Sequence, residues 1–96
     1  MSQLANQIAV VTGAGRGIGR AIAEAFAEVG ADVVCAARTP EQIDETAAVV
    51  RRHGRRALAV ACDVTERAQL EHVVADALRE FGRIDIVVNN AGGWPP

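Results

Sequence analysis

The 96-residue sequence contains no lysine, no tyrosine and a single serine, and aromatic residues make up only 3% of it. Without lysine it cannot form the phosphate-binding loop of P-loop nucleotide hydrolases, which requires one. Half of the residues are apolar, and most of these are alanine and valine. That composition suits thin, closely packed layers of helix and sheet better than a core built on large rings.

Cysteine and one-sided charge are also scarce. Cys35 and Cys62 are the only cysteines, both within apolar runs, so we expect two reduced, buried thiols and no metal site. A net charge of −2 provides no basic field for nucleic acid. No apolar run approaches the ~20 residues of a membrane span, and residues 1–7 lack the pattern of a signal peptide. We therefore expect a cytoplasmic protein with neither nucleic-acid nor membrane partners.

Short apolar runs alternate with amphipathic stretches along the whole chain. We predict strands at about 8–11, 32–37, 57–62 and 84–88, and helices at about 17–29, 40–53 and 66–81. Strands separated by single helices run parallel with right-handed crossovers. The prediction is an α/β fold, part of a Rossmann-type doubly wound sheet in the order 3-2-1-4, with residues 1–96 as one cofactor-binding unit.

Each predicted helix has an apolar face and signals at its ends. Thr39 is expected to cap the second helix, with Gln42 completing a capping box, and Thr65 is expected to cap the third. The residues predicted to point inward are Ile18, Ile22, Phe26 and Val29, then Ile43, Ala47 and Val50, then Leu70, Val73, Val74, Ala77, Leu78 and Phe81.

The fourth predicted strand is apolar, as expected of an inner strand that is paired on both sides. No later segment of the sequence can pair with it. An exposed apolar edge strand is a liability that complete proteins usually avoid. We therefore interpret the chain as the N-terminal part of a longer protein.

The turn after the first strand is rich in glycine, with Gly13, Gly15, Gly17 and Gly19 between Thr12 and Arg20. Glycines at a strand-to-helix turn allow positive φ and a close approach of the backbone to a ligand. The helix that follows presents free N–H groups and a partial positive charge, which favour a diphosphate. This context predicts a dinucleotide or nucleotide site, and the alternative is a glycine-rich turn without a ligand.

The form Thr-Gly-x-x-x-Gly-x-Gly occurs here with Asp63-Val64 after the third strand and Asn89-Asn90-Ala91-Gly92 after the fourth. In this order the three motifs resemble the short-chain dehydrogenase/reductase family over nearly the whole chain, most closely its beta-ketoacyl carrier-protein reductases. The resemblance implies that the backbone of residues 13–19, with Arg16 in the loop and Ile18 at the helix start, holds the diphosphate of a nicotinamide cofactor.

The resemblance also assigns the other two motifs. It implies that Asp63 accepts a bond from the adenine amino group and that the Val64 backbone lies beside the ring. A structural alternative is that Asp63 only accepts N–H bonds within its turn. Asn90, with Ala91 and Gly92, would lie beneath the cofactor ribose, while Asn89 would brace the sheet.

The end of the second strand bears on the choice between NADP and NAD. Sites that prefer NAD place a carboxylate there for the ribose 2′-hydroxyl, whereas this chain has Ala37 followed by Arg38. The planar guanidinium of Arg38 can bind a 2′-phosphate at this position. Arg16 in the glycine loop can reach the same end of the second strand. We therefore predict NADP, with NAD the less favoured cofactor. The alternative is that Arg38 is simply solvated.

The family transfers hydride between nicotinamide and a carbonyl or alcohol carbon, using a tyrosine, a lysine and a serine. The sequence has no tyrosine or lysine, and its only serine is Ser2, so we assign no catalytic residue. The resemblance implies an NADP-dependent oxidoreductase of a small carbonyl or alcohol substrate, and a homotetramer or homodimer when full length. A non-catalytic nucleotide-binding or regulatory module is the alternative. An S-adenosylmethionine-dependent methyltransferase also has a glycine-rich first loop, but it would need an acidic residue near Ala37. The sequence has none there, so this function is disfavoured.

Overall fold

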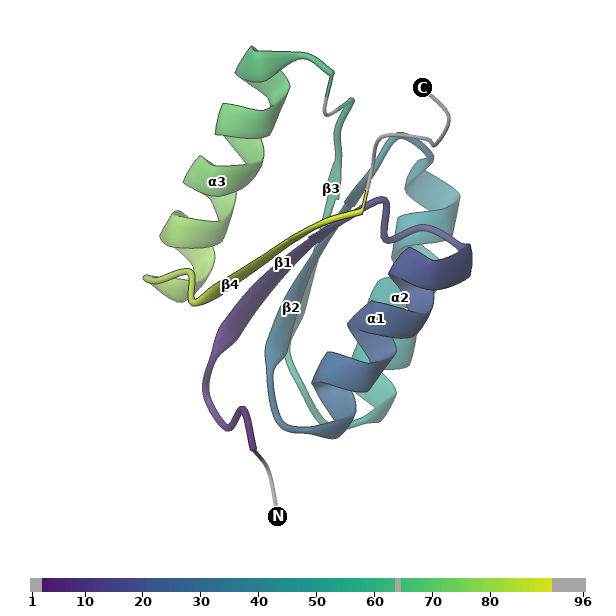
Figure 1. The fold of residues 1–96 in the computed structure, drawn as a ribbon, viewed down its shortest axis with the longest axis vertical. Coiled ribbons are helices and arrows are strands. Elements are labelled where there is room, and N and C mark those ends of the chain that lie inside the picture. The colour runs from purple at the N-terminus through teal and green to yellow at the C-terminus, as the bar shows by residue number, and fades with distance from the viewer. Residues whose placement is uncertain (1–2, 64, 91–96) are drawn as a thin grey trace.

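The computed structural model, which describes residues 3–63 and 65–90, contains one parallel sheet in the order β3-β2-β1-β4 (Figure 1). This confirms the predicted fold class and strand order. The strands are β1 (Ile8–Thr12), β2 (Asp32–Ala37), β3 (Ala57–Ala61) and β4 (Ile86–Asn89), and the helices are α1 (Gly17–Glu28), α2 (Pro40–Arg52) and α3 (Arg67–Phe81).

The two central strands are buried along almost their whole length, as expected of continuous apolar runs in a parallel sheet. β1 pairs with β2 from Ile8 opposite Asp32 onward, and with β4 as far as Thr12 opposite Asn89. Because all four strands run in one direction, their carboxyl ends lie along one edge of the sheet. The turns that follow the strands are gathered there.

Helices cover both faces of the sheet, with α1 and α2 on one face and α3 on the other (Figure 1). Each face has its own apolar core, because successive side chains of a strand point to opposite faces. The core under α3 includes Ile8, Val10, Val34, Ala36, Val60, Cys62, Val73 and Ala77. The core under α1 and α2 includes Val11, Ala14, Ala23, Ala27, Val33, Cys35, Ile43 and Val50.

The smallest residues of α1 form its buried face. Its buried residues are Gly19, Ala23 and Ala27, and its predicted inward residue Ile18 is 73% exposed. The prediction for Ile18 was therefore wrong, because glycine and alanine let the helix axis lie close to the sheet and carry Ile18 outside the contact. The prediction for α2 was correct: Ile43, Ala47 and Val50 are all buried.

Only one side of α3 is covered within the part of the chain that the structure describes. Val73 and Ala77 are buried, whereas the predicted inward residues Leu70, Val74 and Leu78 are 38%, 39% and 46% exposed. No second helix among residues 3–63 and 65–90 packs on that face of the sheet, so the apolar face of α3 is wider than its contact. On β4, Val87 is 62% exposed.

Two predicted caps and one strand boundary were also wrong. α3 begins after Glu66, because the Thr65 hydroxyl donates to Asp63 Oδ1 instead of capping the helix. Thr39 does precede α2 but forms no side-chain cap bond, so the capping box is absent. β4 begins at Ile86, two residues later than predicted.

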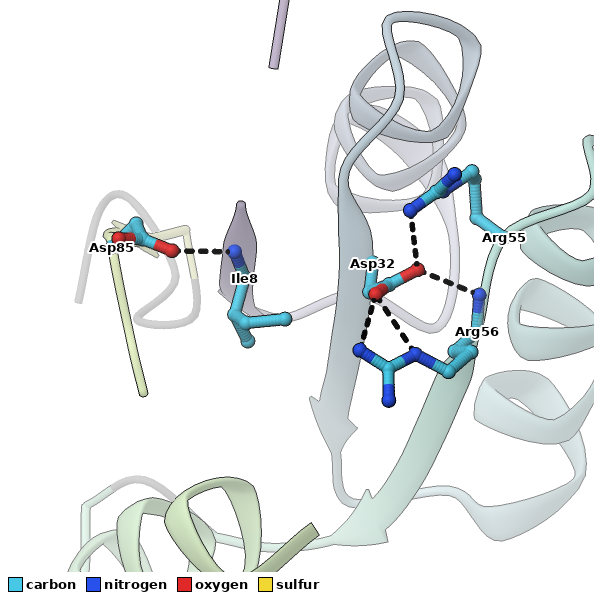
Figure 2. A network of polar contacts seen from close by, with 5 residues as sticks. All are labelled: Ile8, Asp32, Arg55, Arg56 and Asp85. Atoms are coloured by element: carbon cyan, nitrogen blue, oxygen red, sulfur yellow. Dashed lines mark hydrogen bonds and ion pairs between the residues drawn. The ribbon is translucent and has the colours of Figure 1, made fainter. Parts of the chain in front are cut away.

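The amino edge of the sheet contains an ion-pair network centred on Asp32 (Figure 2). The Asp32 side chain is 2% exposed. Its Oδ1 accepts a bond from the Arg56 backbone N at 2.8 Å, and its Oδ2 accepts one from Arg56 Nε at 3.0 Å. Arg55 contributes a second guanidinium, 3.2 Å from Oδ1. The network joins the start of β2 to the residues before β3.

Asp85 provides a second side-chain link at the same edge (Figure 2). Its Oδ2 accepts a bond from Ile8 N at 2.8 Å, and its backbone N donates to Ile8 O at 2.9 Å. Because Asp85 uses its side chain here, regular strand pairing starts only at Ile86.

Cys35 and Cys62 are free and buried, as predicted. Burial raises the pKa of the Cys35 thiol to about 12, so this thiol is protonated and unreactive at neutral pH. In the described ranges, 3–63 and 65–90, no helix has both the length and the hydropathy of a membrane span.

Candidate functional site

The candidate site lies at the carboxyl edge of the sheet. The glycine loop of residues 13–19 follows β1, Arg38 follows β2, and Asp63 lies two residues beyond β3. Asn90 directly follows β4. The parallel topology therefore brings four sequence-distant segments to one edge, where ligands bind in open α/β sheets.

The glycines of the loop serve two different purposes. Gly13 and Gly17 have positive φ values of 65° and 59°, which other residues adopt only with strain. At Gly15 and Gly19, neighbouring atoms leave no room for a side chain. A Cβ on Gly19 would lie 1.9 Å from Gly13 O and 2.8 Å from Asn90 Nδ2. Helix α1 can therefore start against the loop and beside Asn90 only because residue 19 has no side chain.

Helix α1 begins without a side-chain cap. Arg16 occupies the N-cap position in an extended conformation and makes no capping bond, and the first turn contains no acidic residue. Gly17 and Ile18 are exposed, and a Cβ placed on Gly17 would meet no atom within 4 Å. No side chain caps the first-turn amides, and the helix start at Gly17 and Ile18 is exposed, which is the environment that an anionic group needs at a helix N-terminus.

Backbone and side-chain bonds hold the loop from the neighbouring strand and helix. Ala14 N donates to Ala36 O at 3.2 Å, and the Thr46 hydroxyl of α2 donates to Ala14 O at 2.8 Å. Thr46 was not among the predicted site residues. A signal was present, since Thr46 lies on the same helical face as Ile43 and Val50, and a buried hydroxyl requires a partner.

Thr12 connects the end of β1 to the end of β4. Its Oγ1 lies 3.2 Å from both Val88 O and Asn89 Oδ1, and accepts a bond from Asn90 N at 3.0 Å. Asn89 is therefore in contact with the central strand, the bracing position expected for it. Asn90 is held by its backbone, and its side chain lies beside Gly19.

Asp63 is part of a tight turn. Its Oδ1 accepts bonds from Thr65 N at 3.0 Å and Thr65 Oγ1 at 2.6 Å, while its own N donates to Gln69 Oε1 at 2.7 Å. The bonds from Thr65, with a smaller effect of the Arg38 charge, lower the pKa of this carboxyl, so it is ionised at neutral pH. Both bonds from Thr65 use Oδ1, so the structural alternative for Asp63 is realised, and among the described residues none is hydrogen-bonded to Oδ2.

The remaining predicted positions differ in what the structure says of them. Arg16 and Arg38 are exposed at the carboxyl edge, and their convergence on one phosphate stays a prediction. Val64, Ala91 and Gly92 lie outside the described residues.

A separate group of possible metal ligands lies at the far end of α1 from the glycine loop. His53 Nε2 is 3.0 Å from Glu24 Oε2 and 4.0 Å from Glu28 Oε1. The donor atoms of the three residues lie within 4.8 Å of one another. All three side chains are partly solvated, and we interpret the group as an ion-pair cluster between α1 and the end of α2.

Comparison with known proteins gives consistent matches over the whole chain. The short chain dehydrogenase family model matches residues 7–96. An uncharacterized oxidoreductase of Mycobacterium tuberculosis is 47% identical over the full chain, and an uncharacterized NAD-dependent oxidoreductase of the same species is 42% identical over 95% of it. The structure of carveol dehydrogenase from Mycobacterium avium in complex with NAD matches with a TM-score of 0.91, at 33% identity over 96% of the chain.

The chain is much shorter than these relatives. It spans 36% and 38% of the two mycobacterial oxidoreductases and 38% of carveol dehydrogenase. The matched region contains the sheet edge, the glycine loop and the start of α1.

Proposed function

Because the chain belongs to the short-chain dehydrogenase family, we propose that it binds NADP and forms the cofactor-binding part of an oxidoreductase. The observation that carries this proposal is the uncapped start of α1. No side chain caps its amides, and Gly17 and Ile18 are exposed at the carboxyl edge, next to glycines that keep side chains away. A dinucleotide diphosphate fits these donors in charge and size.

In this proposal, backbone amides of the loop and of the first turn of α1, at Gly17 to Gly19, bind the diphosphate. Asp63 uses Oδ2 to accept a bond from the adenine amino group, and the Val64 backbone lies against the ring. Asn90, Ala91 and Gly92 form the floor beneath the ribose next to the nicotinamide. The cofactor, when bound, supplies or accepts a hydride.

The preference for NADP rests on Ala37, the last residue of β2, and on Arg38, which follows it. Ala37 offers no carboxylate to bind a ribose 2′-hydroxyl or to repel a phosphate, and Arg38 is exposed beside it. We propose that Arg38, assisted by Arg16, pairs with the 2′-phosphate. NAD is the competing cofactor, since one relative is an NAD-dependent oxidoreductase and carveol dehydrogenase binds NAD.

Titration of the protein with NADPH and NADH tests the proposal. We expect NADPH to bind at least about tenfold more tightly than NADH. Arg38→Ala should remove most of that difference by weakening NADPH binding and should leave NADH binding within about twofold. Arg52→Ala is the matched control, because Arg52 is exposed at the other end of α2. Equal affinities of the unmutated protein for both cofactors would contradict the preference, and no binding of either would contradict the function.

For the longer protein we propose hydride transfer between the nicotinamide and a small carbonyl or alcohol substrate, and assembly as a homo-oligomer. The tyrosine and lysine that the resemblance implies for proton transfer would belong to the remainder of the longer protein, since neither occurs in these 96 residues. The proposed hydride transfer is tested by incubating the longer protein with such substrates and cofactor. The change in NADPH absorbance measures oxidation or reduction of the substrate.

A further inference from the structure

We propose that Thr46 and Gln42, on one face of α2, are positioning residues that fix the glycine loop for diphosphate binding. This inference rests on the proposed function and concerns the same site. Neither residue belongs to a loop motif, and both reach the loop from a helix about 30 residues later in the chain.

The Thr46 hydroxyl holds the Ala14 peptide from one side. Thr46 is fully buried, and its Oγ1 lies 2.8 Å from Ala14 O and 3.1 Å from Gln42 O. A hydroxyl has one hydrogen to donate, and Ala14 O is the nearer acceptor. Gln42 O lies within α2 and accepts a backbone hydrogen bond of the helix. Ala14 O lies in a turn and has no helical bond of this kind. Thr46 therefore has its main effect on the loop.

This bond determines where the next amide points. In a trans peptide the C=O of one residue and the N–H of the following residue point in opposite directions. Since Ala14 O points to Thr46 on α2, Gly15 N–H points away from α2. The Ala14 N–H is meanwhile bound by Ala36 O of β2 at 3.2 Å. The peptides on both sides of Ala14 are thus held in one orientation.

The Gln42 side chain packs against the backbone of the glycine loop at Gly15 and so limits where the loop can lie. A Cβ on Gly15 would lie 2.9 Å from Gln42 Oε1 and 3.0 Å from Gln42 Cβ. Helix α2 therefore packs directly against the Gly15 backbone, which explains why residue 15 is a glycine. The same helix begins two residues after Arg38, so one rigid element links the proposed 2′-phosphate contact to the diphosphate loop.

The decisive experiment compares two ligands on matched variants. NADPH contains the diphosphate, whereas 2′-AMP has the adenine and the 2′-phosphate but no diphosphate. We expect Thr46→Val to weaken NADPH binding about tenfold, because it removes the hydroxyl while keeping the shape of the side chain. Binding of 2′-AMP should stay within about twofold of the unmutated protein.

Two further variants separate positioning from general stability. Thr46→Ser keeps the hydroxyl and should bind NADPH like the unmutated protein. Val49→Ala removes buried volume from α2 at a residue that is 7% exposed. It should lower the denaturation midpoint without changing either dissociation constant of the folded protein.

NADPH affinity of a folded Thr46→Val variant equal to that of the unmutated protein would overturn the inference and leave the proposed function intact. An equal loss of affinity for both ligands would also overturn it. Failure of the unmutated protein to bind NADPH would instead overturn the proposed function. If Thr46→Val does not fold, Gly15→Ala provides the same test, with selective loss of NADPH binding expected and unchanged binding contradicting the inference.

Discussion

The two edges of the sheet satisfy their polar groups in opposite ways. At the amino edge, charged side chains close the structure: Asp32 binds Arg55 and Arg56, and Asp85 binds the backbone of Ile8 (Figure 2). At the carboxyl edge, uncharged side chains such as Thr12 and the short turn of Asp63 and Thr65 hold the strand ends, while the glycine loop leaves the start of α1 without a side-chain cap. At the amino edge the two carboxylates bind donors of the chain itself, although Arg55 Nε is buried without a partner among the described residues, whereas the carboxyl edge keeps the uncapped start of α1 for a ligand.

The difference shows how one small unit combines stability with binding. A buried carboxylate surrounded by guanidinium and amide donors contributes to stability only while all partners are present. A helix start without a cap forgoes stabilisation of about 1 kcal/mol but offers amides to an anion. Substitutions at the amino edge should therefore change stability alone, and substitutions at the carboxyl edge should change both stability and ligand affinity.

The largest effect is expected for Gly19→Ala at the carboxyl edge. The added methyl group would overlap Gly13 O, which is backbone and cannot move aside without displacing the loop. We expect a loss of about 3 kcal/mol in the free energy of unfolding, measured by urea denaturation. NADPH affinity should fall roughly 100-fold. A variant with unchanged affinity would show that the loop does not bind the cofactor.

A somewhat smaller effect is expected for Asp32→Ala at the amino edge. It leaves the Arg56 amide and two guanidinium groups without their acceptor. Since the Arg55 and Arg56 side chains are 27% and 64% exposed, the expected cost is about 2 kcal/mol, below that of a fully buried pair. Urea denaturation measures it, with Glu45→Gln, which breaks an exposed 3.5 Å pair with Arg20, as a near-neutral control. NADPH affinity of the folded Asp32→Ala protein should not change, and a large change would break the separation of the two edges.

Gly17→Ala separates two reasons for a glycine in the loop. Gly19 has no room for a side chain, whereas Gly17 has room but a positive φ. A Cβ at Gly17 has open space around it, but φ is 59°. The expected cost is therefore conformational, about 1 kcal/mol in unfolding free energy, clearly less than for Gly19→Ala. Equal losses for the two variants, measured side by side by urea denaturation, would contradict this distinction.

The smallest effect concerns acid stability of the amino edge. The Arg83 bonds, with the bond from Ile8 N, lower the pKa of Asp85 in the folded protein. Its stabilising contribution is therefore complete above the unfolded value of about 3.9 and is lost as the pH falls through the lower folded value. Urea midpoints measured between pH 6 and 3 should fall less steeply for Asp85→Asn than for the unmutated protein. Parallel curves would contradict this assignment.

The sequence predicted the sheet and its strand order because apolar runs and glycine punctuation are local patterns. It also predicted the glycine loop, since the glycines between a strand and a helix are close together in sequence and need no tertiary information to recognise. Leu70, Val74 and Leu78 were predicted wrongly because apolar periodicity shows which face of a helix is hydrophobic and not whether a neighbour covers it. Thr46 was missed because its partner, Ala14 O, is a backbone atom of a distant loop.

The position of β1 between β2 and β4 has a consequence for how the chain acquires its structure. The Ile8 amide and the Asp85 carboxylate are 77 residues apart in sequence, as are the side chains of Thr12 and Asn89. During synthesis, one side of β1 therefore stays without its partner strand until β4, at Ile86–Asn89, has left the ribosome. Contacts of such long range slow folding, so the arrival of β4 determines when β1 is paired on both sides.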